Sequence, residues 1–163
     1  MSDAGNTFRL AIGVFYEPLR LESAIGDLHT DGVPAPHMCL AGARQAIDGL
    51  ALPAPGGGAT LLTGQLRPLP LTDYPQLVAT DGRLLHTLLE HTKPDQQGPA
   101  LGYSWLLPDL FAGLTDHLRA GAVALLVSAP DTGVQRRNSR ILLRHSAHTV
   151  QTHEFAPRRP GTR

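Results

Sequence analysis

Two apolar segments near opposite ends of the chain constrain its fold most strongly. Residues 8–16 (FRLAIGVFY) place Phe8, Leu10 and Ile12 on one face of an extended segment and leave the other face largely apolar as well. Residues 122–128 (AVALLVS) form a continuous apolar run of strand length. Strands that are covered on both faces lose the usual alternation of polar and apolar residues. The two segments are therefore predicted to be the central strands of one sheet.

Helical periodicity follows or precedes each of these segments. After Pro18, which a first helical turn tolerates, apolar residues recur at i, i+3, i+4 and i+7: Leu21, Ala24, Ile25 and Leu28. A second helix with the same spacing is predicted from Leu107, Leu110, Phe111, Leu114 and Leu118, and Gly121 ends it. Asp131 or Thr132 can cap a third helix that runs to about His145. Its predicted inward residues are Val134, Ile141 and Leu142.

Two weaker strands complete the pattern. Residues 36–41 begin with Pro36 and lie close to Pro34, and neither proline can donate to a ladder. Residues 148–155 are rich in polar side chains. Both segments are predicted to be edge strands. The resulting order matches the split β-α-β arrangement of ferredoxin-like folds, in which the first and third strands are central. The predicted class is therefore α+β with a ferredoxin-like sheet.

Nine of the 17 glycines and seven of the 14 prolines lie in residues 42–102, between the two halves of this pattern. Prolines and the Gly56-Gly57-Gly58 run interrupt residues 42–102, which predicts a long Pro/Gly-rich insertion with short strands at 61–62 and 76–80 and a short helix at 82–91. A chain of 163 residues suits one domain. The predicted organisation is a single domain over residues 1–163, divided into four parts: a first half at 8–41, the insertion at 42–102, a second half at 104–155, and a flexible basic tail at 156–163.

Segments in both halves resemble two families of bacterial proteins. Residues 10–33 (LAIGVFYEPLRLESAIGDLHTDGV) and 110–130 (LFAGLTDHLRAGAVALLVSAP) are similar to heat-induced general stress protein domains and to a related family of small bacterial proteins of unknown function. The resemblance implies the fold and a cytoplasmic compartment, and it carries over no catalytic residue. The chain departs from the second family in its polar, Pro-rich middle, where that family has a Gly-rich, membrane-compatible segment.

The composition bears on compartment. No apolar run reaches the roughly 18 residues of a membrane span, and the first residues lack the features of a secretory signal. We therefore expect a cytoplasmic protein without membrane insertion. The single cysteine, Cys39, excludes an internal disulfide and a cysteine-rich metal site.

Charge is distributed unevenly although the net charge is zero. Residues 132–163 hold seven arginines and one acid, Glu154, so the first 131 residues carry the balancing negative charge. Four of these arginines lie on the third predicted helix: Arg136, Arg137, Arg140 and Arg144. They suit phosphate or carboxylate groups, and the alternatives are a solvated helix face or ion pairs with the acidic part of the chain. Nucleic acid is disfavoured because no aromatic platform accompanies the arginines.

Eight histidines make metal binding worth considering. His37 and Cys39 lie two apart on a predicted strand, hence on one face, and could supply two ligands to Zn(II) or Cu(I). The alternative is a core thiol beside an exposed histidine. His145 is predicted to close the third helix, His148 and His153 to face opposite sides of the last strand, and His86 and His91 to be poorly spaced for one helix face.

No nucleophile motif or phosphate-binding loop is present in the sequence, and no cofactor is predicted. The leading hypothesis is a non-enzymatic, stress-associated or accessory protein that acts by self-association, as a homo-oligomer, or by binding another protein. One alternative is a sensor or regulatory domain that binds a small ligand, an anion or a metal. Another is an enzyme whose pocket is formed by residues 42–102.

Overall fold

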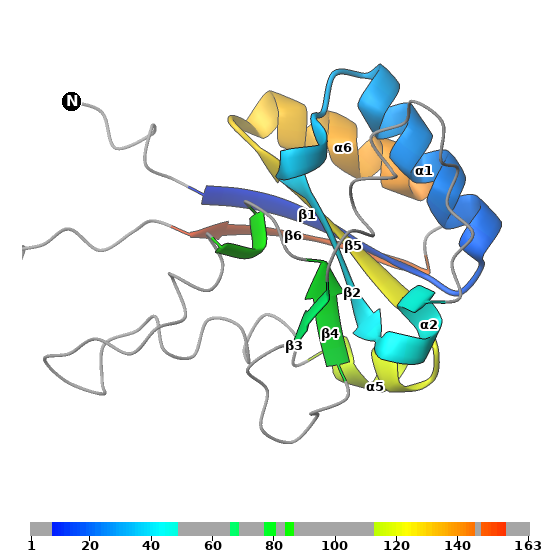
Figure 1. Cartoon of the computed structure of the whole chain (residues 1–163). Helices are drawn as coiled ribbons and strands as arrows, with labels where there is room; N and C mark the ends of the chain where they lie inside the picture. The colour runs from blue at the N-terminus through cyan, green and yellow to red at the C-terminus, as the bar shows by residue number, and fades with distance from the viewer. Residues whose placement is uncertain are drawn as a thin grey trace, which may run out of the picture.

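A computed structural model of the chain describes residues 8–48, 66–68, 77–80, 84–86, 113–145 and 148–155. Within these ranges one antiparallel sheet of six strands has the order β3-β4-β2-β5-β1-β6 (Figure 1). The strands are β1 Phe8–Phe15, β2 Met38–Ala43, β3 Leu66–Pro68, β4 Leu77–Thr80, β5 Val123–Ala129 and β6 Thr149–Phe155. Helices and sheet together confirm the α+β class.

Two long helices pack beside each other on one face of the sheet (Figure 1). They are α1 Pro18–Thr30 and α6 Thr132–Arg144. The shorter elements are the 3-10 helix η2 Ala35–His37, α2 Arg44–Asp48 and α5 Thr115–Arg119. Among the described residues no helix has the length and apolar character that crossing a membrane requires.

The sequence pattern placed the core elements correctly. β1 pairs with β5 on one side and with β6 on the other, so residues 8–16 and 122–128 contribute the inner strands as predicted. The apolar stripe of α1 is buried, and that helix is followed by Gly32, whose φ of +100° strains any side chain. Asp131 caps α6 by accepting a hydrogen bond of 2.9 Å from the backbone N–H of Val134.

The prediction that residues 36–41 form an edge strand is wrong. β2 begins only at Met38 and lies between β5 and β4. Pro34 and Pro36 precede the ladder, so neither proline removes a donor from it. β6 is an edge strand as predicted, and within the described residues β3 forms the other edge.

The described parts of residues 42–102 are strands of the sheet and short helical segments. The predicted strand at 76–80 is confirmed as β4, and residues 84–86 are helical, with Leu84 and Leu85 buried. These apolar residues complete the sheet and its cover where irregular structure was expected. The predicted strand at 61–62, the remainder of the 82–91 helix and the tail at 156–163 lie outside the described residues.

The second predicted helix is shorter where the structure describes it. α5 begins at Thr115, after a turn at Gly113 and Leu114, and it ends before Gly121, whose φ is +108°. The earlier members of its stripe, Leu107, Leu110 and Phe111, lie outside the described residues. In α6, Ile141 and Leu142 are buried as predicted, but Val134 is only half-buried and the amides of Gln135 and Asn138 are buried instead.

Both faces of the strands β1, β2, β4 and β5 are buried. The face under α1 and α6 includes Leu40, Leu125 and Val127 in one apolar cluster with residues of both helices. The opposite face includes Leu10, Ile12 and Leu126 in a second cluster with Leu84, Leu85, Leu114 and Leu118. Because these strands are buried on both faces, only the edges of the sheet offer backbone groups for pairing with another strand.

Candidate functional site

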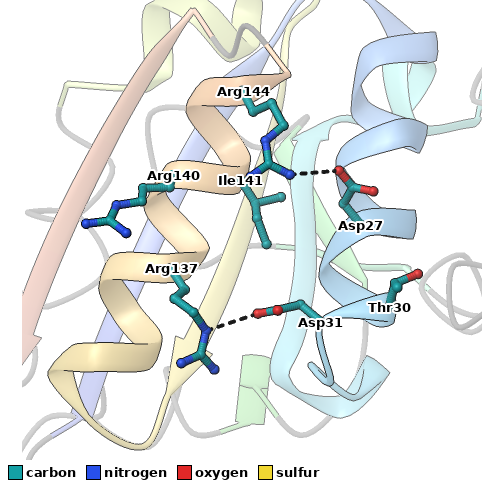
Figure 2. A pocket seen from close by; sticks show the side chains of 7 residues that line it. All are labelled: Asp27, Thr30, Asp31, Arg137, Arg140, Ile141 and Arg144. Atoms are coloured by element: carbon teal, nitrogen blue, oxygen red, sulfur yellow. Dashed lines mark hydrogen bonds and ion pairs between the residues drawn. The ribbon is translucent and has the colours of Figure 1, made fainter.

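A groove between α1 and α6 collects most of the arginines that the sequence singled out (Figure 2). Its volume is about 310 Å³. Its lining residues are Asp27, Thr30, Asp31, Arg137, Arg140, Ile141 and Arg144. Arg137 Nε lies 3.3 Å from Asp31 Oδ2, and Arg144 Nη1 lies 3.6 Å from Asp27 Oδ2. The helices are therefore joined by ion pairs across the groove.

The four arginines do not act as one stripe. Arg137 and Arg144 are two helical turns apart and reach toward α1, whereas Arg140 points away from it (Figure 2). Arg136 and Arg140 are exposed and have no ion pair or hydrogen bond among the described residues. The structure thus uses two of the arginines in contacts with the acidic first part of the chain.

The carboxylate of Asp27 contacts both Arg144 and His145 in this groove. Its Oδ2 lies 2.7 Å from Nε2 of His145, the residue that closes α6 as predicted. The hydrogen bond from His145, together with the charges of His145 and Arg144, lowers the pKa of Asp27 below its usual 3.8 in spite of some desolvation. Asp27 therefore stays ionised and ties the end of α6 to α1.

His37 and Cys39 occupy different environments. Cys39 is buried in the cluster opposite α1 and α6, and its Sγ lies 3.6 Å from the carbonyl oxygen of Thr80. His37 belongs to η2 and is half-buried. The strand alternation that put both residues on one face does not extend to His37, because the strand begins after it. In the described part of the chain, no group of three or more His, Cys, Asp or Glu side chains is arranged to hold a metal ion.

Sequence spacing missed a cluster of three rings at one end of the sheet. Tyr16 Oη lies 2.6 Å from Nδ1 of His117, and the ring centres of His117 and His148 are 4.8 Å apart. The rings of Tyr16 and His148 are 5.4 Å apart and almost perpendicular, at 84°. The residues are so distant in sequence that no local motif could have indicated the cluster.

A surface pocket adjoins these rings. It has a volume of about 230 Å³ and is lined by Phe15, Tyr16, Glu17, Arg20 and His148. Glu17 and Arg20 pair with each other at 2.7 Å, and Tyr16 is 46% exposed. The phenol of Tyr16 and the imidazole of His148 are therefore accessible from solvent, and His117 is half-buried beside them.

The remaining candidate site is the side of β6 that faces away from β1. Among the described residues β1 is the only strand that pairs with β6. Thr152 and Glu154 are exposed, and the carboxylate of Glu154 lies 3.5 Å from Arg9 Nε of β1. An edge strand presents unpaired backbone donors and acceptors that can bind another strand.

The fold and these sites define the chain as an α+β protein with buried sheet faces and an accessible edge strand. Comparisons of the chain with protein-family models, curated proteins and solved structures found no match.

Proposed function

We propose that this chain is a non-enzymatic accessory protein that self-associates by pairing its β6 edge with β6 of a second copy. Its core in this proposal is a ferredoxin-like split β-α-β unit formed by β1, α1, β2, β5, α6 and β6. The strand order β2-β5-β1-β6 supports that core, with β4 and β3 as an extension. The similarity of residues 10–33 and 110–130 to general stress protein domains supports a stress-associated role.

The observation that carries this function is the outward backbone of Thr152, which faces no other described strand. Val14 pairs with Thr149, and its carbonyl oxygen accepts a hydrogen bond of 2.6 Å from the backbone N–H of His148, so this carbonyl points toward β6. Along an antiparallel strand, the backbone N–H and C=O groups of successive residues point to opposite sides. Thr152 is paired with Ala11, which is three residues from Val14, so the backbone groups of Ala11 point away from β6. The N–H and C=O of Thr152 are therefore directed away from β1.

The residues of β6 also favour strand pairing. The segment TVQTHEF has no proline or lysine, the residues that commonly protect exposed edges. Antiparallel pairing of two copies about Thr152 would place Glu154 opposite Val150 of the second copy. Two like charges would therefore not face each other, and the sheet would continue across a two-fold axis.

Size-exclusion chromatography with light scattering tests the proposal on the full chain. The wild-type protein should form a dimer at low and at high salt, because backbone hydrogen bonds hold it. Thr152→Pro removes the outward N–H and should give a monomer with an unchanged circular dichroism spectrum. Thr152→Val keeps the N–H and the shape of the side chain, and should remain dimeric. A wild-type monomer at all concentrations, or a dimeric Thr152→Pro variant, would refute edge pairing.

A further inference from the structure

We infer that Tyr16, His117 and His148 form a binding site for a late first-row transition-metal ion, with Zn(II) and Cu(II) as the expected ions. Two imidazoles and one phenol supply nitrogen and oxygen donors from three separate segments: Tyr16 directly follows β1, His117 lies in α5, and His148 directly precedes β6. Imidazole favours zinc, copper and nickel, whereas magnesium and calcium take oxygen ligands. This site is independent of self-association through β6.

The spacing of the rings fits coordination of one ion. Zinc binds imidazole nitrogen at about 2.0–2.1 Å, so two histidines on adjacent positions of one ion have ring centres roughly 4.5–5.5 Å apart. The observed separation between His117 and His148 is 4.8 Å. Tyr16 Oη is already 2.6 Å from Nδ1 of His117, which puts the phenol oxygen next to a ligand atom.

The backbone holds each ligand in place. The N–H of His148 is bonded to Val14 of β1, two residues before Tyr16. The carbonyl of His117 accepts hydrogen bonds from Ala120 and Ala122, which join the end of α5 to the start of β5. β5 in turn pairs with β1 through Val123 and Phe15. The backbone segments that carry the three ligands are therefore held together before an ion arrives, which reduces the entropic cost of binding.

The site needs Tyr16 as its third ligand, because the described residues hold no third His, Cys, Asp or Glu beside the two histidines. Phenol oxygen becomes a stronger donor when the ion displaces its proton, which passes to solvent. The adjoining pocket of about 230 Å³ leaves room for water or a small ligand at a fourth position. Such an open position is typical of sites that exchange a ligand.

Isothermal titration of the untagged full chain with Zn(II) and Cu(II) tests this inference, with Mg(II) as a comparison ion. The wild-type protein should bind one equivalent of Zn(II) or Cu(II) and no Mg(II). His117→Ala and His148→Ala should each weaken binding by at least about tenfold. The matched control is His29→Ala, which removes an exposed histidine of α1 outside the cluster and should bind as the wild type does.

Tyr16→Phe distinguishes coordination from ring packing, because it keeps the aromatic ring and removes only the oxygen. Cu(II) bound to the wild-type protein should show a phenolate-to-copper charge-transfer band that this variant lacks. Circular dichroism verifies that each variant is folded. The absence of Zn(II) and Cu(II) binding by the wild-type protein would overturn the inference and leave the cluster as ring packing. Equal binding by a folded His117→Ala variant, or equal loss in His29→Ala, would also overturn it.

Discussion

On the face of the sheet that α1 and α6 cover, buried polar side chains lie among apolar ones, whereas the opposite face is packed almost entirely by aliphatic residues. Gln135 on the first face donates hydrogen bonds from Nε2 to the carbonyl oxygens of Leu10 and His153, at 2.9 and 3.2 Å. Asn138, one turn further along α6, is completely buried, and its amide has no partner among the described residues.

The difference shows that the two faces contribute to the fold in different ways. Burial of apolar surface stabilises both faces without fixing a direction. On the helical face, the hydrogen bonds from Gln135 also fix the position of α6 on the sheet. The ion pairs of Asp27 and Asp31 fix its position beside α1. An unpaired amide there has a cost, since a buried polar group without a partner lowers stability by about 1–3 kcal/mol.

The largest expected effect comes from truncating the core on the face opposite the helices. Leu126 is fully buried in that cluster, and Leu126→Ala should lower the free energy of unfolding by about 2–5 kcal/mol, because it leaves a cavity. Urea unfolding followed by circular dichroism measures the change.

The neighbouring Leu125 provides a matched control, because it is equally buried and faces α1 and α6. Leu125→Ala should cost a similar amount, which would establish that both faces are parts of the core. A cost below about 1 kcal/mol for Leu126→Ala alone would contradict a closed second face.

A smaller effect, of opposite sign, is expected at Asn138. Leucine has the same branching at Cγ and no polar atoms, so Asn138→Leu should raise the free energy of unfolding by about 1 kcal/mol. Gln135→Leu is the matched control on the same helix, and it should lower stability because the carbonyl oxygens of Leu10 and His153 lose a donor. Urea unfolding measures the free energy of unfolding of both variants. If both substitutions lowered it equally, the assignment of Asn138 as unpaired would be wrong.

The smallest effect is expected at Asp27, whose carboxylate is partly exposed. Asp27→Asn should destabilise the protein by less than about 1 kcal/mol at neutral pH, and by less still at high salt. Glu22→Gln on α1 serves as a control. It changes a charge that has no hydrogen bond or ion pair with any described residue, and it should have no measurable effect.

The pH dependence of Asp27 has a definite sign. Its folded pKa is below the unfolded value of 3.8, so its contribution is complete above that value and is lost as the pH falls through the lower folded pKa. The free energies of unfolding of the wild-type protein and of Asp27→Asn should therefore differ at neutral pH, and this difference should vanish as the pH falls to about 2. A difference that grows on acidification would contradict the ion pair.

Local patterns were sufficient for the helices α1 and α6 and for the inner strands β1 and β5. The stripe of α1 and the cap at Asp131 depend on neighbours within a few residues, and both were predicted correctly. The position of β2 was not predicted correctly. Its second neighbour, β4, lies in residues 42–102, where the many prolines indicated irregular structure. The burial of Gln135 and Asn138 was also not predicted, because helical periodicity is read from apolar residues and assigns polar side chains to the surface.

The sequence by itself determined the α+β class, the inner strands β1 and β5, and the positions of α1 and α6, because those features follow from side-chain period, caps and glycine conformations near each element. Only the tertiary structure decided that Arg137 and Arg144 pair with α1 while Arg140 points away, and that Tyr16, His117 and His148 meet at one end of the sheet. Contacts between distant segments depend on strand order and helix packing, which no local spacing encodes.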